Sequence, residues 1–170
     1  ATPSPVATLP TDSAVRDIAT AGGILYVAEV GKRLRIVDIH ELPKMEIIGE
    51  IELDLAPLSL GACRTVLAVG EMQYIHGGVR LFSIEAPTAP REIGWIDLGT
   101  DVLGVHLSET TAWAALGHDG LVSLDISDPA IPRLRKRWTM ERVAFWDAVV
   151  QNRIIYAATA TNGIILLSED

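Results

Sequence analysis

Short apolar runs separated by turn residues recur along the whole chain. In the first part, the runs "VRDIA", "ILYVAE", "LRIVDI" and "IIGEIEL" are divided by Gly22-Gly23, by Gly31 and by a Pro-containing stretch. Runs of about 4–8 residues, rich in Val and Ile and bounded by Gly and Pro, are typical of β-strands. The pattern therefore predicts an all-β chain with four short strands in this stretch.

The same four-run pattern returns three times. Ile39, Ile84 and Ile126 occupy one repeat position, and a period of roughly 40–45 residues suits the four-stranded blade of a β-propeller. We expect a single β-propeller domain over residues 1–170. Its repeat units are Val15–Leu53, Pro57–Leu98, Val102–Met140 and Phe145–Asp170, the last of which stops early.

The second and third runs of each unit are continuously apolar, as in "IIYAA" and "GIILL". Continuous runs indicate sheets that are buried on both faces, as blades packed face to face would be. Only the fourth runs alternate, as in "EIIGEIEL", which indicates an outermost strand.

The fourth unit lacks its last strand, and the N-terminus resembles one. "PSPVATLPTD" (Pro3–Asp12) overlays "PREIGWIDLG" (Pro90–Gly99), with Val6 on Ile93 and Leu9 on Ile96. We therefore predict that residues 3–12 complete the last blade and close a four-bladed ring. Two chains that exchange this strand would instead form an eight-bladed ring, and a disordered leader over residues 1–10 is the third interpretation.

At this point the runs resemble a known family. "LRIVDI", "GVRLFSIEAPTAP" and above all "GLVSLDISDPAIP" are similar to the LVIVD repeat, whereas "GIILLSED" departs from it. The resemblance implies a β-propeller, commonly with more than four blades, on secreted or surface proteins of prokaryotes. It implies an extracytoplasmic location and no particular activity.

Composition and charge narrow the range of possible functions. The net charge of −8 opposes binding to nucleic acid, and no apolar run approaches the length of a membrane span. Cys63 is the single cysteine, which excludes an internal disulfide. The chain starts without Met, which is compatible with signal cleavage or with a trimmed terminus.

Two carboxylates and a histidine are candidates for chemistry at the axis. Asp17 and Asp147 share the third position of the first strand, where the other units have Ser59 and Gly104. Paired carboxylates could bind a divalent cation, and together with His106 they could serve a hydrolase-like enzyme. The alternative is that both accept hydrogen bonds from backbone amides. We predict no other cofactor.

The loops between the second and third strands vary most. "EMQYIHGG" is longer than its equivalents, and such loops share a rim with the connections between blades. The alternative is that Tyr74 and Ile75 only cover the mouth of the channel. The predicted ligand contacts on this rim are Tyr74, His76, His118, Asp119, Asn162 and Trp146.

No catalytic motif is recognisable, so the sequence favours a binding module over an enzyme. The partner is a protein or a small ligand, and the third hypothesis is half of a dimeric eight-bladed propeller. Two further sets of residues are interpreted as structural. Trp95 and Trp138 cover blade edges, and turn-stabilising oxygens end the third strands at Asp38, Ser83, Asp125 and Ser168.

Overall fold

The strands form four antiparallel sheets, which we call blades 1 to 4. The computed structural model describes residues 4–72 and 76–169. Blade 1 contains β1 (Val15–Ala21), β2 (Ile24–Glu29), β3 (Arg33–Asp38) and β4 (Glu46–Glu52). Blade 2 contains β5 (Ala56–Cys63), β6 (Val66–Met72), β7 (Gly78–Ser83) and β8 (Arg91–Asp97). Blade 3 contains β9 (Gly104–Leu107), β10 (Thr111–Ala115), β11 (Leu121–Asp125) and β12 (Arg133–Trp138). Blade 4 contains β13 (Phe145–Gln151), β14 (Ile154–Thr159) and β15 (Ile164–Ser168).

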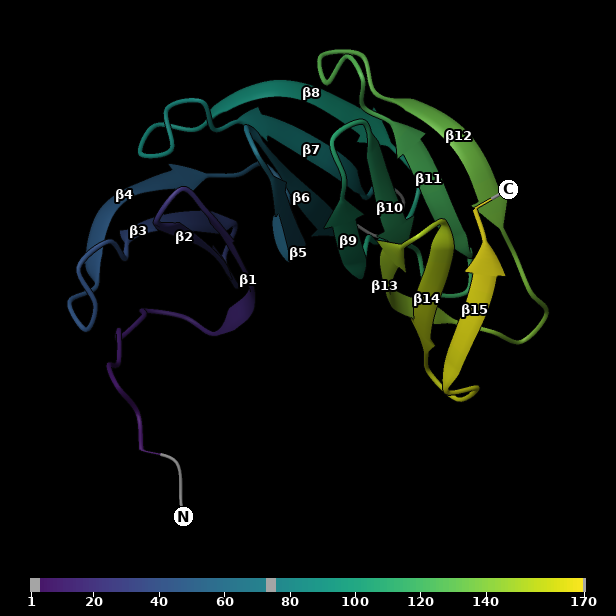
Figure 1. The fold of residues 1–170 in the computed structure, drawn as a ribbon, viewed down its shortest axis with the longest axis horizontal. Helices are drawn as coiled ribbons and strands as arrows, with labels where there is room; N and C mark the ends of the chain where they lie inside the picture. Colours follow the sequence, from purple (N-terminus) through teal and green to yellow (C-terminus); the bar gives the residue numbers. More distant parts are fainter. Residues whose placement is uncertain (1–3, 73–75, 170) are drawn as a thin grey trace.

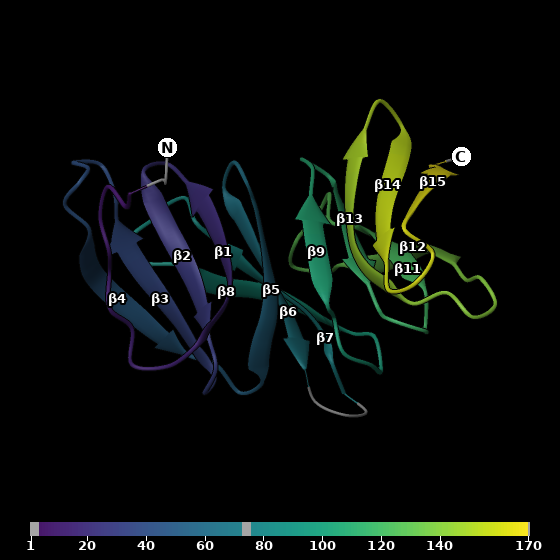
Figure 2. The same ribbon diagram turned by 90° about the horizontal axis from the view of Figure 1, so that it is seen from below.

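Strands follow one another across each sheet in chain order, and the sheets lie side by side in a crescent (Figure 1). The first strands, β1, β5, β9 and β13, line the inner side, whereas β4, β8 and β12 lie outside. A view turned by 90° shows the four inner strands in a row (Figure 2). The prediction of an all-β chain built of propeller-like blades is confirmed in this form.

The register repeats from blade to blade. In the first strand, the pairing shifts immediately before Asp17, Ser59 and Asp147. A second shift recurs between the third and fourth strands of blades 1, 2 and 3. Shared bulges at shared positions allow residues of different blades to be equated through their pairing partners.

The core lies between the blades. Tyr26, Leu34 and Ile36 of blade 1 pack in one cluster with Leu67 and Phe82 of blade 2, and similar clusters join blades 2 to 3 and 3 to 4. Burial of both faces explains why the second and third strands are continuously apolar.

The expected closure by residues 3–12 is not present in this structure. Residues 4–12 contain no strand, Val6 is 83% exposed, and β15 lies at the edge of its sheet beside β14. The carboxylate of Asp12 is instead held on blade 1, where Arg35 Nη2 donates to it at 2.7 Å. None of the described residues form a helix long and apolar enough to span a membrane.

Candidate functional site: the axis and the loop rim

The axial carboxylate of Asp17 joins two blades. Its Oδ1 accepts a hydrogen bond from the Ile18 amide at 2.8 Å, and its Oδ2 accepts one from the Leu60 amide of blade 2 at 2.7 Å. Both oxygens therefore satisfy backbone donors, which is the structural alternative that the sequence left open.

Asp147 occupies the same position in blade 4. Its Oδ1 accepts from the Ala148 amide at 2.8 Å. Burial raises the pKa of the Asp147 carboxyl, and the negative charge of Asp17 raises it further. The hydrogen bond from the Ala148 amide and the charge of His106 lower this pKa and so oppose the increase. A side chain at Gly104 would meet this carboxylate, because a Cβ there would lie 2.6 Å from Asp147 Oδ1. Blades 3 and 4 can approach closely here because position 104 is glycine.

His106 also belongs to the axis, but it faces an aromatic ring. Its imidazole lies 5.7 Å from the Trp113 ring, centroid to centroid, and burial lowers the pKa of His106 while Asp147 partly opposes this. Within residues 4–72 and 76–169, no three His, Cys, Asp or Glu side chains gather as a metal site would require. The cation at Asp17 and Asp147 stays a prediction.

The loop rim is built as the sequence predicts. Lys32 and Gly77, in loops between second and third strands, accept hydrogen bonds from the Leu53 and Leu98 amides in the connections to the next blade. The two kinds of connection therefore lie on one edge of the crescent. The rim carries a cleft of about 350 Å³ at the seam of blades 1 and 2, lined by Asp54, Leu55, His76, Arg80, Glu92 and Trp95.

Charges and one aromatic ring define this cleft. Arg80 is largely buried, and it donates to Glu71 Oε1 at 2.7 Å and to Glu92 Oε2 at 2.9 Å. His76 lies at the edge, with its Nδ1 3.6 Å from a carboxylate oxygen of Asp97. Trp95 is 39% exposed. The cleft thus offers an apolar surface beside groups of both signs, which suits a ligand with an apolar part and charged ends.

Of the predicted contacts, only His76 lines the cleft. His118 and Asp119 are exposed in the loop between β10 and β11, and Asn162 lies in a turn closed by Thr159 on blade 4. Trp146 is 57% exposed on β13. Tyr74 lies outside the described residues. The structure therefore spreads these side chains over three blades.

Sequence reasoning missed Arg80, Glu92 and Asp54, and it interpreted Trp95 only as a residue that covers a blade edge. One signal was available, because Arg80 interrupts the apolar run "GVRLF". The same interruption occurs in "LRIV", where the buried Arg35 lies 2.6 Å from the buried Glu29. A charge inside a strand that is buried on both faces needs a partner of opposite charge.

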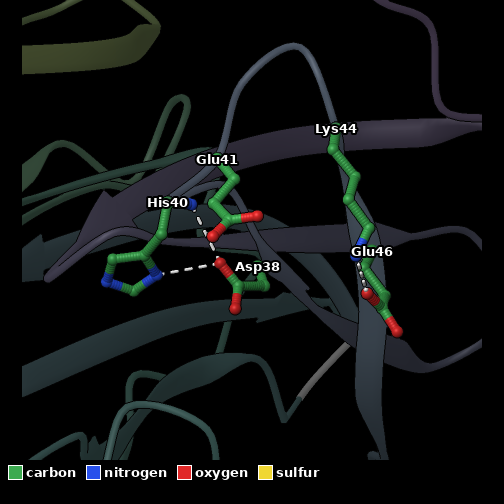
Figure 3. A pocket seen from close by; sticks show the side chains of 5 residues that line it. All are labelled: Asp38, His40, Glu41, Lys44 and Glu46. Atoms are coloured by element: carbon green, nitrogen blue, oxygen red, sulfur yellow. Dashed lines mark hydrogen bonds and ion pairs between the residues drawn. The ribbon is translucent and has the colours of Figure 1, made fainter.

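A second hollow lies near the loop between β3 and β4, lined by Asp38, His40, Glu41, Lys44 and Glu46 (Figure 3). Four of its five side chains interact in pairs. Asp38 Oδ1 accepts from the His40 amide at 2.9 Å and lies 2.8 Å from His40 Nδ1, and Lys44 pairs with Glu46 at 2.9 Å. Asp125 Oδ1 likewise accepts from the Ser127 amide at 3.0 Å. The interpretation of Asp38 and Asp125 as turn-stabilising residues is confirmed.

The blades, the axial strands and the shared loop rim define a propeller-like repeat protein. The LVIVD repeat profile matches residues 13–51 and 99–139, which hold the first three strands and most of β4 in blade 1 and the whole of blade 3. The chain is an LVIVD-repeat protein.

Solved structures agree in fold. The computationally designed Ika4 protein is 10% identical, with a TM-score of 0.77 over 98% of this chain and 99% of that one. Kuenenia stuttgartiensis hydrazine synthase is 16% identical, with a TM-score of 0.76 over 95% of this chain and 48% of that one. The β-propeller domain of Myceliophteria thermophila Cps50 (Swd1) is 15% identical, with a TM-score of 0.75 over 98% and 55%.

This chain therefore spans about half the length of the last two structures. At these identities the likeness concerns the fold alone. No curated protein sequence matches the chain.

Proposed function

We propose that this chain is a non-catalytic binding module that presents its loop rim to a protein segment or a small ligand. One observation carries the proposal, namely the cleft at the seam of blades 1 and 2. It combines the partly exposed ring of Trp95 with the basic groups of Arg80 and His76 and the acidic groups of Asp54 and Glu92. Binding sites commonly join an apolar surface to a few polar groups that orient the ligand.

The ligand class follows from these groups. An amine would be placed by Asp54 or Glu92, a carboxylate by His76 or Arg80, and an apolar side chain by Trp95. Arg80 is held in place by its bonds to Glu71 and Glu92, so it would meet a ligand without reorganising. Zwitterionic peptides with one large apolar side chain fit this description.

Saturation-transfer NMR with a panel of zwitterionic dipeptides, each carrying an aromatic or aliphatic side chain, tests the proposal. We expect signal transfer with the unsubstituted chain and its loss in a double variant, His76→Ala with Trp95→Ala. His118→Ala is the matched control, because it removes an exposed histidine from another loop of the rim. Equal signal transfer in the double variant would show that the dipeptides bind outside the cleft. If no dipeptide received signal even with the unsubstituted chain, the cleft would not be a binding site for this class of ligand.

We also propose that residues 3–12 complete the last blade as its fourth strand. The support is the alignment of Leu9 with Ile96, together with the entry of the chain into blade 1. Asp12 precedes Val15 by three residues, just as Asp54 precedes Pro57, and Val15 and Pro57 pair with Glu29 and Glu71 at equivalent positions. Residues 12–15 thus repeat the connection that follows a complete fourth strand.

A further inference from the structure

The outer face of blade 4 carries an uncovered apolar patch, formed by Val149, Tyr156, Ile164 and Leu166. Val149 pairs with Tyr156, and Tyr156 pairs with Leu166, so these side chains form one row across three strands. Ile164 lies on the same face in the neighbouring row. The exposed fractions are 51% for Val149, 39% for Tyr156, 72% for Ile164 and 61% for Leu166.

The positions equivalent to Tyr156, Ile164 and Leu166 are buried in the other blades. Tyr156 corresponds to Tyr26, Ala68 and Trp113, which are at most 4% exposed. Those residues lie in the clusters that join each blade to the next. Position 164 behaves in the same way, because its equivalents Leu34, Val79 and Leu121 are each 0% exposed. The patch therefore has the composition of a blade seam, but no following blade covers it.

The opposite end of the crescent is the face of blade 1 that a preceding blade would cover. Ile18 on blade 1 is 55% exposed, whereas its equivalents Leu60, Val105 and Ala148 are at most 7% exposed, because each packs in a seam with the preceding blade. On blade 1 the exposure is confined to Ile18, because Val27 and Arg35, which continue its row across β2 and β3, are 3% and 6% exposed. An exposed apolar position that is buried in the internal seams thus lies at each end of the chain.

We propose that the patch on blade 4 docks onto blade 1 of a second copy of this chain, so that two copies form a closed ring with two identical seams. Such a head-to-tail pair closes with twofold symmetry. In each seam, residues 4–10 of one copy would lie along the free edge of β15 of the other. By register, Leu9 would then pair with Ile164, as Ile51 pairs with Leu34 in blade 1.

Two observations favour a second copy over the chain's own blade 1. The crescent leaves blades 1 and 4 at opposite ends, and the N-terminal segment runs away from β15 (Figure 1). This docking surface is separate from the rim cleft and does not depend on the proposed binding function.

Sedimentation equilibrium of the full chain tests the docking. We expect a species of twice the 18.3 kDa chain mass. Replacement of Ile164→Glu should weaken association by about 100-fold or more, because a charge would be buried in an apolar seam. Ile131→Glu, at another exposed isoleucine outside the patch, should leave the dimer intact. A monomeric unsubstituted chain, or a dimer equally stable in both variants, would overturn the proposal.

Cross-linking separates the second copy from the chain's own strand. In a Cys63→Ser background, one chain carries Leu9→Cys and the other Ile164→Cys, and the two are mixed under mild oxidation. We expect a covalent pair between the two different chains and none when Ile131→Cys replaces Ile164→Cys. The proposal would be overturned if the disulfide formed only within a single chain that carries both cysteines. Failure of dipeptide binding would leave these outcomes unchanged.

Discussion

At the scale of the residue, hydrogen bonds from particular polar groups join neighbouring blades. Asp17 satisfies two amides from neighbouring blades, and the hydroxyl of Tyr26 donates to the carbonyl oxygen of Pro87 in blade 2 at 2.9 Å. Such bonds contribute about 1 kcal/mol each, but leaving a buried partner unsatisfied costs more. The seams therefore depend on particular atoms as well as on apolar area.

Tyr26 should make stability sensitive to alkaline pH. Burial raises the pKa of Tyr26 to about 12, above its usual value near 10. Its contribution is therefore complete below about pH 10 and is lost as the pH rises through about 12. Urea unfolding at pH 9 and pH 11.5 should show a larger loss for the unsubstituted chain than for Tyr26→Phe. An identical loss in both would contradict the assignment.

At the scale of the element, buried ion pairs link the second and third strands of blades 1 and 2. Glu71 on β6 is fully buried beside Arg80 on β7, and Glu29 and Arg35 repeat the arrangement in blade 1. These pairs interrupt apolar strands, so each charge depends on its partner. Burial raises the pKa of Glu71, and the hydrogen bonds and charge of Arg80 act against this.

Removal of one partner should therefore be costly. We expect Glu71→Ala to lower the free energy of unfolding by about 3–5 kcal/mol, because Arg80 would remain buried without its main acceptor. Glu46→Ala is the control, since it breaks the exposed pair with Lys44 and should change stability by at most about 1 kcal/mol. Chemical denaturation measures both, and comparable small losses would show that water replaces Glu71 without cost.

At the scale of the whole molecule, the blades approach one another most closely at the axis. A Cβ at Gly61 would lie 2.9 Å from the Val105 carbonyl oxygen, and one at Gly104 would lie 2.7 Å from that of Trp146. Backbone on both sides leaves little room for adjustment. The spacing of the axial strands, and through it the curvature of the crescent, depends on these glycines.

Gly104→Ala should push blades 3 and 4 apart. We expect it to lower the free energy of unfolding by about 1–3 kcal/mol, as overpacking of a closely packed region does. Gly49→Ala is the matched control, because the nearest atom to its Cβ would be a side-chain carbon of Ile36 at 3.4 Å. Thermal unfolding of both variants gives the comparison. Equal stability would mean that the axial strands can separate freely.

The repeated pattern of apolar runs and turns was sufficient to predict the blades and the strands that bury both faces. These features follow from local periodicity, and each repeat unit contains that periodicity in its own residues, for example in "LYVA" and "LRIVDI". The turn roles of Asp38 and Asp125 were also predictable, because the groups that they bind lie two residues further along the chain.

Only the tertiary structure decided the cleft and the open ring. Arg80 and Trp95 pair across β7 and β8 of blade 2, and Asp54 joins them from the connection between blades 1 and 2, which no local pattern encodes. Whether four blades close depends on the curvature summed over all seams, to which the close contacts at Gly61 and Gly104 contribute. The sequence by itself therefore determined the repeating unit, and the packing between units decided where the site lies and which faces stay uncovered.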